Sequence, residues 1–235
     1  MTRTKPALTI EWLDRTRNQL LLALPFYFLV PVLFYLAYQA AGITPSWAMI
    51  GVGALGWFVA LNLRAPVAIL ANKFAGSESK ATTWVVSSSG PLEEVIRVAV
   101  LLYFGRDLAT ALAIGFGWAA IEVVFAVVNS LVGNMLLRSD DPKIVEAREM
   151  LAQQMNTDNG PWWGVVERIF ASAYHIGSTV ILAFMPLAVV ITAPVHSAVN
   201  LISVALTKRS MFAFQAMMAV VGTLTLALGL ALFLL

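Results

Sequence analysis

The sequence predicts an all-α protein, a polytopic transmembrane helix bundle of about seven spans, and composition is the main reason. Of its 235 residues, 60% are hydrophobic and only 12% are charged, and the mean hydropathy is +0.81. A soluble domain carries about 25% charged residues. Apolar runs recur along the chain and reach the roughly 20 residues that a helix needs to cross a bilayer. We therefore expect a single transmembrane domain over residues 1–235, surrounded by lipid.

Two features of the composition exclude classes of function. The net charge is only +2 and no dense cluster of Lys and Arg occurs, so we expect no nucleic-acid partner. The chain has no cysteine, which excludes disulfides, cysteine-ligated metals and thiol nucleophiles.

Seven apolar runs are the predicted spans. They cover roughly residues 19–41, 47–72, 82–104, 108–137, 163–185, 188–207 and 211–234. The polar N-terminal segment 1–18 precedes the first run, which is too long for the core of a signal peptide. We expect the second span to bend at Arg64-Ala65-Pro66, because proline removes a backbone donor. Only the uncharged Met185-Pro186-Leu187 separates the fifth and sixth spans, which predicts a tight helical hairpin or one broken helix.

The longest polar interruption is the segment 138–161, which we expect to be a cytoplasmic loop with a short amphipathic helix. Asp140-Asp141-Pro142 is typical of a helix start, with proline at the first helical position. Ile144, Val145, Leu151 and Met155 then form an uneven apolar stripe. Such a helix is expected to lie at the membrane surface.

The basic residues predict the orientation of the bundle. Four segments on one side of the predicted topology hold Arg3, Lys5, Arg15, Arg17, Lys73, Lys80, Arg138, Lys143, Arg148, Lys208 and Arg209. The opposite loops hold Arg106 alone. Because Lys and Arg collect on the cytoplasmic side, we expect the N-terminus inside and the C-terminus outside. We expect the protein in the plasma (inner) membrane of a prokaryote.

Four predicted spans contain side chains that are costly inside lipid. In chain order these are Glu93, Glu94, Arg97, Trp118, Glu122, Glu167, Arg168, His175, His196 and Asn200. A charge at mid-span costs about 2.5–3.5 kcal/mol even on the lenient insertion scale. Such residues usually face the interior of a bundle, pair with one another and mark a functional path.

The spacing of these residues allows them to converge. Glu93 and Arg97 are four residues apart and share a helix face, as do His196 and Asn200. Gly90-Pro91 can start a helix, which would place Glu93 near the positive end of its dipole. The sequence thus permits one water-accessible pocket between four helices. Packing alone also explains part of the set, because Arg97 with Glu94, and Arg168 with Glu167 or Glu122, form plausible interhelical ion pairs.

The ordered motifs resemble those of the YhfC family of intramembrane peptidases. The motifs are Glu93-Glu94-x-x-Arg97, Trp118-x-x-x-Glu122, Glu167-Arg168 followed by His175, and His196-x-x-x-Asn200. More distantly they are similar to the PrsW proteases and the CAAX prenyl endopeptidases, and the likeness covers about residues 84–206. The resemblance implies a glutamate-type intramembrane endopeptidase that cleaves a membrane-associated protein or peptide.

The resemblance also implies roles for the individual residues. The catalytic set is Glu93, Glu122, His196 and Asn200, with Glu93 as the general base and with His196 and Asn200 holding the oxyanion. Glu122 stands where the CAAX enzymes have histidine and PrsW has glutamate. The supporting set is Glu94, Arg97, Trp118, Glu167, Arg168 and His175, in which Glu94 and Arg97 orient the base.

Three alternatives stay open from the sequence. We expect no cofactor, but Glu93, Glu122, His175 and His196 offer ligands for a catalytic zinc, in a zinc-dependent protease built from the same residues. Intramembrane Glu and His residues also serve as proton relays, which would suit a proton-coupled transporter. A non-catalytic membrane scaffold is the third alternative.

Overall fold

Helices account for nearly all of residues 8–154 and 160–234, the part of the chain that the computed structural model describes, and no strand occurs in that part. The helices are α1 (Ile10–Ala40), α2 (Trp47–Asn62), α3 (Arg64–Phe74), α4 (Glu78–Phe104), α5 (Leu108–Leu136), α6 (Pro142–Gln154), α7 (Pro161–Phe184), α8 (Val189–Arg209) and α9 (Met211–Leu234), with a 3-10 turn η1 (Pro186–Ala188) before α8. The all-α prediction is confirmed.

Five helical segments are long and apolar enough to cross a membrane. They are Ile10–Ala40, Trp47–Phe74, Leu108–Leu136, Pro186–Arg209 and Met211–Phe233. Large apolar side chains cover their outer surfaces; Leu22, Ile69 and Val190 are 68%, 68% and 72% exposed. These helices are consistent with an integral membrane protein. Helices α4 and α7, which carry most of the charged residues of the motifs, do not belong to this set.

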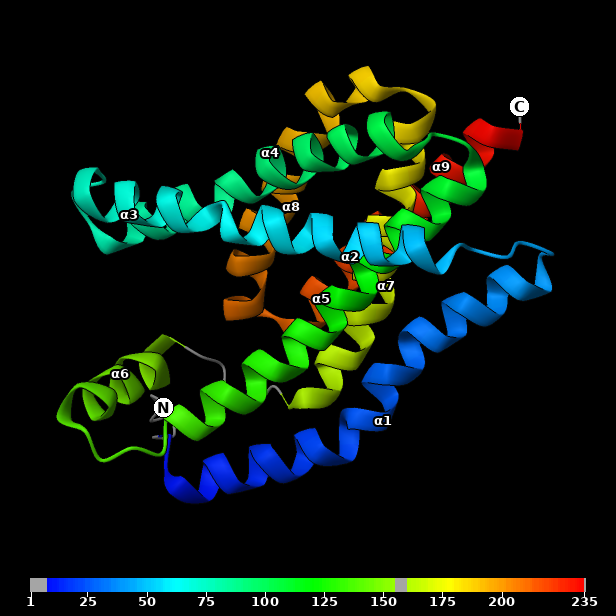
Figure 1. Ribbon diagram of the computed structural model, residues 1–235. Helices are drawn as coiled ribbons and strands as arrows, with labels where there is room; N and C mark the ends of the chain where they lie inside the picture. The colour runs from blue at the N-terminus through cyan, green and yellow to red at the C-terminus, as the bar shows by residue number, and fades with distance from the viewer. Residues whose placement is uncertain (1–7, 155–159, 235) are drawn as a thin grey trace.

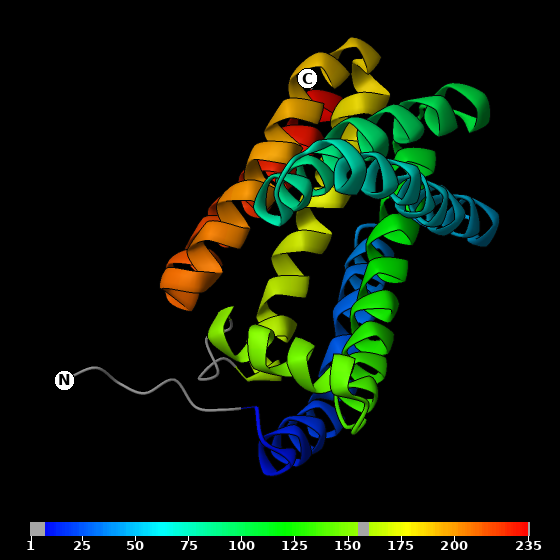
Figure 2. The same cartoon turned by 90° about the vertical axis from the view of Figure 1, so that its left-hand side faces the viewer.

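The helices pack around a centre formed by α4, α5, α7 and α8. Helix α7 contacts α9, α5 and α1, while α2 contacts α5 and α4, and α4 contacts α8. Figures 1 and 2 show α2 and α3 as a nearly continuous rod beside α4. In Figure 1 the start of α1, the α3–α4 turn and α6 lie toward the left, whereas the α1–α2 and α4–α5 connections and the end of α9 lie toward the right.

Glycines bring the central helices into close contact. A Cβ atom on Gly117 of α5 would lie 1.9 Å from Ile50 O of α2, and one on Gly90 of α4 would lie 2.1 Å from Ala193 O of α8. On the other side of α5, a Cβ on Gly115 would meet Ile176 Cα at 2.9 Å. Small residues of this kind let membrane helices approach closely. These glycines allow α4 to contact α8, and α5 to contact α2 and α7, at short backbone distances.

Helix α4 corrects one prediction. It begins at Glu78, with Ser77 as its N-cap, and continues through Gly90 and Pro91, so the predicted helix start at Gly90-Pro91 is wrong. Pro91 has no N–H for the carbonyl of Ser87, and the Ser197 hydroxyl of α8 donates to that carbonyl instead at 2.6 Å. Glu93 therefore lies in the middle of a 27-residue helix, away from the positive end of its dipole.

The other local predictions have the following outcomes. The second span is interrupted at Leu63, between α2 and α3 and next to the predicted bend at Arg64-Ala65-Pro66, although the two helices remain nearly collinear (Figure 1). The turn η1 separates α7 from α8, which agrees with a helical hairpin. The loop 138–161 contains α6, which begins at Pro142 as predicted, although Met155 lies outside the described residues. The first helix begins at Ile10 rather than near residue 19, so part of the polar N-terminal segment 1–18 is helical.

Candidate functional site

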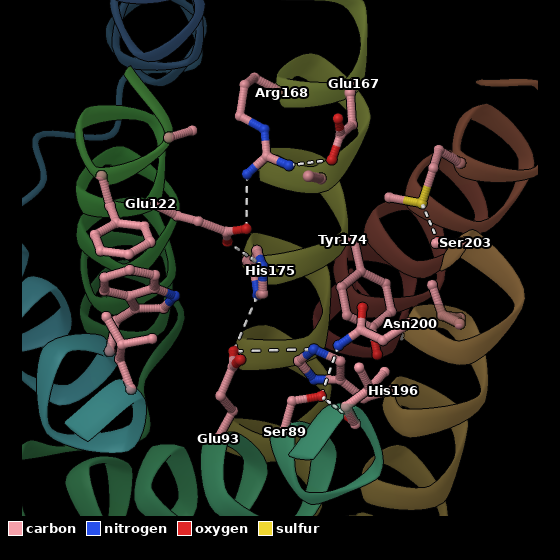
Figure 3. A pocket seen from close by; sticks show the side chains of 18 of the residues that line it. Ser89, Glu93, Glu122, Glu167, Arg168, Tyr174, His175, His196, Asn200 and Ser203 are labelled. Atoms are coloured by element: carbon pink, nitrogen blue, oxygen red, sulfur yellow. Dashed lines mark hydrogen bonds and ion pairs between the residues drawn. The ribbon is translucent and has the colours of Figure 1, made fainter. Parts of the chain in front are cut away.

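A cavity of about 430 Å³ lies between the central helices, and we call it the central cavity. Its walls include Glu93 of α4, Glu122 of α5, His175 of α7, and His196 and Asn200 of α8. All five belong to the ten polar residues whose spacing allows them to converge on one pocket. Figure 3 shows the labelled side chains pointing into the same space from these four helices.

The Glu93 carboxylate is buried in the wall of the central cavity, with 3% of the residue exposed. Its Oε1 accepts a hydrogen bond from the Arg64 guanidinium, and its Oε2 accepts one from Trp118 Nε1 at 3.1 Å. Arg97 Nη2 lies 3.9 Å from the same Oε2. Because a carboxylate offers about four lone-pair sites, Glu93 keeps acceptor capacity for a further partner in the cavity.

Behind the cavity, Glu94 and Arg97 form an ion pair in which both side chains are 0% exposed. Arg97 Nη1 donates to Glu94 Oε1 at 2.6 Å, and the Ser178 hydroxyl donates to Glu94 Oε2 at 2.9 Å. The guanidinium also lies 4.4 Å from the centre of the Trp118 ring, a cation–π contact. The predicted pairing of Arg97 with Glu94 is thus present, but it lies within α4 and is not interhelical; Ser178 connects the pair to α7.

Glu94 also determines which nitrogen of His196 is free. His196 Nδ1 lies 2.7 Å from Glu94 Oε1, and an ionised carboxylate only accepts, so Nδ1 carries the proton. His196 Nε2 then faces the cavity, 3.9 Å from Glu93 Oε2. A carboxylate that holds one imidazole nitrogen and leaves the other free is the arrangement that orients histidines in hydrolases.

His175 is held in the opposite tautomer. Arg97 Nη2 lies 3.0 Å from His175 Nδ1, and a guanidinium has no acceptor, so Nδ1 must accept and the proton resides on Nε2. His175 Nε2 lies 2.6 Å from Glu122 Oε2. The histidine therefore connects the buried Arg97 to the cavity carboxylate of Glu122.

Arg168 pairs with two carboxylates on the cavity wall. Its Nη1 donates to Glu122 Oε1 at 2.7 Å, and its Nη2 donates to Glu167. Both ion pairs that the sequence predicted for Arg168 therefore occur together. The exposed fraction of the side chain rises from 11% for Arg168 through 22% for Glu122 to 30% for Glu167.

Asn200 is anchored through a serine. Its Nδ2 donates to Ser89 Oγ at 2.7 Å, and Ser89 Oγ donates in turn to Val86 O at 2.7 Å. Since an amide nitrogen carries two hydrogens, one N–H of Asn200 stays available to the cavity.

Sequence reasoning missed four residues of the site: Arg64, Ser89, Tyr174 and Ser178. Arg64 was considered only as part of a bend, although a charge within the span 47–72 carries the same cost as those in the third span. Ser178 follows His175 by three residues and therefore shares its helix face, a signal that could have identified it. Tyr174 packs its ring edge-on against both histidines, with centroid distances of 5.6 and 5.2 Å.

The donors around the central cavity do not fit a zinc ion as they are arranged. Within the described residues, no three His, Asp or Glu side chains are placed so that they could hold a metal. One physical reason lies in His175, because Arg97 occupies one of its nitrogens and Glu122 lies against the other. The Arg64 and Arg97 cations beside Glu93 also oppose a second positive charge at that carboxylate.

Comparison with known proteins adds no relative. No family model, no curated protein and no solved structure matches the chain.

Proposed function

We propose that the protein is a glutamate-type intramembrane endopeptidase that cleaves a membrane-associated protein or peptide. The observation that carries the proposal is the convergence of Glu93, Glu122, His196 and Asn200 on one cavity among apolar helices. Charged and polar side chains inside a membrane are costly, and they usually mark a functional site. The cavity combines what amide hydrolysis needs, which is a base for water and donors for an oxyanion. The ordered motifs that resemble the YhfC family favour the same chemistry.

In the proposed reaction, a water molecule lies between Glu93 Oε2 and His196 Nε2. These atoms are 3.9 Å apart, and a water that makes hydrogen bonds of about 2.8 Å can contact both. Glu93 takes a proton as the water oxygen attacks the amide carbon. The C–N bond then breaks, and the leaving nitrogen receives that proton from Glu93.

The developing oxyanion requires donors that are already in place. Asn200 supplies its free N–H. His196 supplies Nε2–H when both of its ring nitrogens are protonated, and Glu94, which lies 2.7 Å from Nδ1, orients the ring so that Nε2 points into the cavity. Arg64 donates to Glu93 Oε1 from a side chain that is 27% exposed, whereas that of Glu93 is 4% exposed.

We infer that α1, α2 with α3, α4, α5, α7, α8 and α9 cross the membrane, with the N-terminus in the cytoplasm. The positions of the loops support this inference, because the α3–α4 turn and α6, which carry Lys73, Lys80 and Lys143, lie on the same side as the start of α1. The charged side chains Glu93, Glu94 and Arg97 of α4 and Arg168 of α7 are buried against neighbouring helices, which explains how these two helices tolerate their charges.

The test uses purified protein in liposomes with a set of synthetic single-span peptides that carry polar tails. Mass spectrometry is expected to detect new peptide termini with the wild-type protein and none with Glu93→Gln. The matched control is Glu78→Gln at the exposed start of α4, which is expected to keep full activity. Equal cleavage by Glu93→Gln and wild type, or no cleavage by the wild type across the peptide set, would refute the proposal.

A further inference from the structure

A second cavity, of about 310 Å³, adjoins the central cavity. Thr16 and Tyr27 of α1, Ser130 and Asn134 of α5, and Gly164 of α7 belong to its walls. A water molecule needs about 10–15 Å³ of such space and two to four polar partners. This cavity has the room and the polar groups for several waters.

A single layer of side chains separates the two cavities. Ala126 of α5, together with Glu167 and Arg168 of α7, lines both of them. Ala126 contributes only a methyl group, so the guanidinium of Arg168 is the main obstacle. It is held by two ion pairs, one to Glu122 Oε1 at 2.7 Å and one to Glu167, and rotation of the arginine away from both carboxylates would join the two spaces.

A polar stripe on α5 runs through both cavities. Glu122, Ala126, Ser130 and Asn134 follow one another at intervals of four residues and therefore share one helix face. Glu122 lines the central cavity, Ala126 lines both, and Ser130 and Asn134 line the second cavity. The Ser130 hydroxyl donates to Ala126 O at 2.7 Å, which leaves its lone pairs free to accept from water.

The facing helices α5 and α7 separate along this stripe. They touch where a Cβ on Gly115 would lie 2.9 Å from Ile176 Cα. Toward the other end, Gly164 of α7 lies against α1 instead, since a Cβ there would be 2.0 Å from the Tyr27 hydroxyl oxygen. Figure 2 shows α5 and α7 moving apart toward the end of the bundle at which α6 lies. The second cavity occupies this widening seam.

We propose that the second cavity is a water-filled vestibule that connects the α6 side of the protein to the central cavity past Arg168. Its ligand is water. The purpose of the vestibule rests on the proposed function, because hydrolysis consumes one water for each bond that is cleaved. The route itself is independent of any substrate and is tested without one.

The test exploits the absence of cysteine from the chain, which allows single-cysteine variants without background. Ser203→Cys reports on the central cavity, Lys143→Cys on the exposed surface of α6, and Leu224→Cys on a lipid-facing position that is 63% exposed. Sealed vesicles with α6 outward, identified by the reaction of Lys143→Cys, receive Ag⁺ from outside. After quenching and solubilisation, a fluorescent maleimide counts the thiols that remain. We expect Ag⁺ to consume the thiols of Ser203→Cys and Lys143→Cys and to spare that of Leu224→Cys.

Plugging variants then test the route. Ala126→Leu places a larger side chain in the shared layer and is expected to slow the reaction of Ser203→Cys by about tenfold or more, because packed side chains exclude water. Ala109→Leu, at an exposed position of the same helix, is the matched control and is expected to have no effect. Ser130→Leu is a second plug at an exposed residue, so the test does not depend on the folding of one variant.

Failure of the vestibule and failure of the protease can be told apart. A Ser203→Cys thiol that does not react from the α6 side, or one that reacts equally fast with both plugs, would overturn the vestibule even if the wild type cleaves peptides. Reaction that both plugs slow would support the vestibule even if no peptide is cleaved.

Discussion

Replacement of Arg97 by methionine is expected to lower the free energy of unfolding by about 3–5 kcal/mol, because it leaves a buried carboxylate without its cation. Arg97 and Glu94 are both 0% exposed, and Arg97 Nη1 donates to Glu94 at 2.6 Å and to Ser178 at 3.0 Å. A hydrogen bond to a charged group contributes about 1.5–3 kcal/mol, and a desolvated cation–π contact contributes about 2 kcal/mol. The apolar packing of methionine offsets part of their loss.

Two further variants test whether the stability lost in Arg97→Met comes from the unpaired carboxylate of Glu94. Arg17→Met breaks an ion pair with Asp14 whose side chains are 46% and 47% exposed, and its cost is expected to stay below about 1 kcal/mol. The double variant Glu94→Gln/Arg97→Met removes both charges and is expected to recover part of the stability that Arg97→Met loses. Unfolding by SDS in mixed micelles, followed by the fluorescence of the 7 tryptophans, measures all three. The reasoning is refuted if Arg97→Met costs no more than Arg17→Met, or if the double variant is less stable than Arg97→Met.

Three further predictions concern packing, capping and metal dependence. Gly90→Ala is expected to cost about 1–3 kcal/mol in the same unfolding assay because its Cβ would meet Ala193 O at 2.1 Å, whereas Gly133→Ala, with no atom within 4 Å, is the control that is expected to lose nothing. Asp107→Ala removes the N-cap of α5 and is expected to cost about 0.5–2 kcal/mol at neutral pH. Hydrogen bonds from Thr110 hold the pKa of Asp107 below its usual range, so this stabilisation is present above the unfolded pKa of about 3.9 and is lost as the pH falls through the lower folded pKa; a difference between wild type and Asp107→Ala that grows in acid would contradict the assignment. Peptide cleavage is expected to survive a strong chelator, and inhibition that zinc reverses would show that the histidines rearrange to bind metal.

Much of the helical architecture could be predicted because most of the long helices coincide with an apolar run. The runs 108–137 and 211–234 correspond closely to α5 (Leu108–Leu136) and α9 (Met211–Leu234). The start of α4 was misplaced because proline usually begins or breaks a helix. Pro91 cannot donate a hydrogen bond to the carbonyl of Ser87, and the hydroxyl that donates instead belongs to Ser197, more than 100 residues further along the chain. No local sequence pattern could reveal this contact.

The residues of the central cavity were predictable to a similar degree. Glu93, Glu122 and His196 stood out because each is costly in lipid and must therefore face protein. Arg64 was overlooked because it is one charge in an otherwise apolar run, and its partnership with Glu93 spans two helices that are separated in sequence.

The buried polar cluster itself was determined by the sequence alone, because the cost of exposing charges to lipid dictates that they turn inward wherever the helices lie. Only the tertiary structure decided how the cluster is connected. Glu94 accepts a hydrogen bond from Nδ1–H of His196. Arg97 donates to Nδ1 of His175, so the proton of that ring lies on Nε2. Those two tautomers follow from distances near 3 Å between groups on different helices, and such distances depend on where glycines such as Gly90 and Gly115 let the backbones touch.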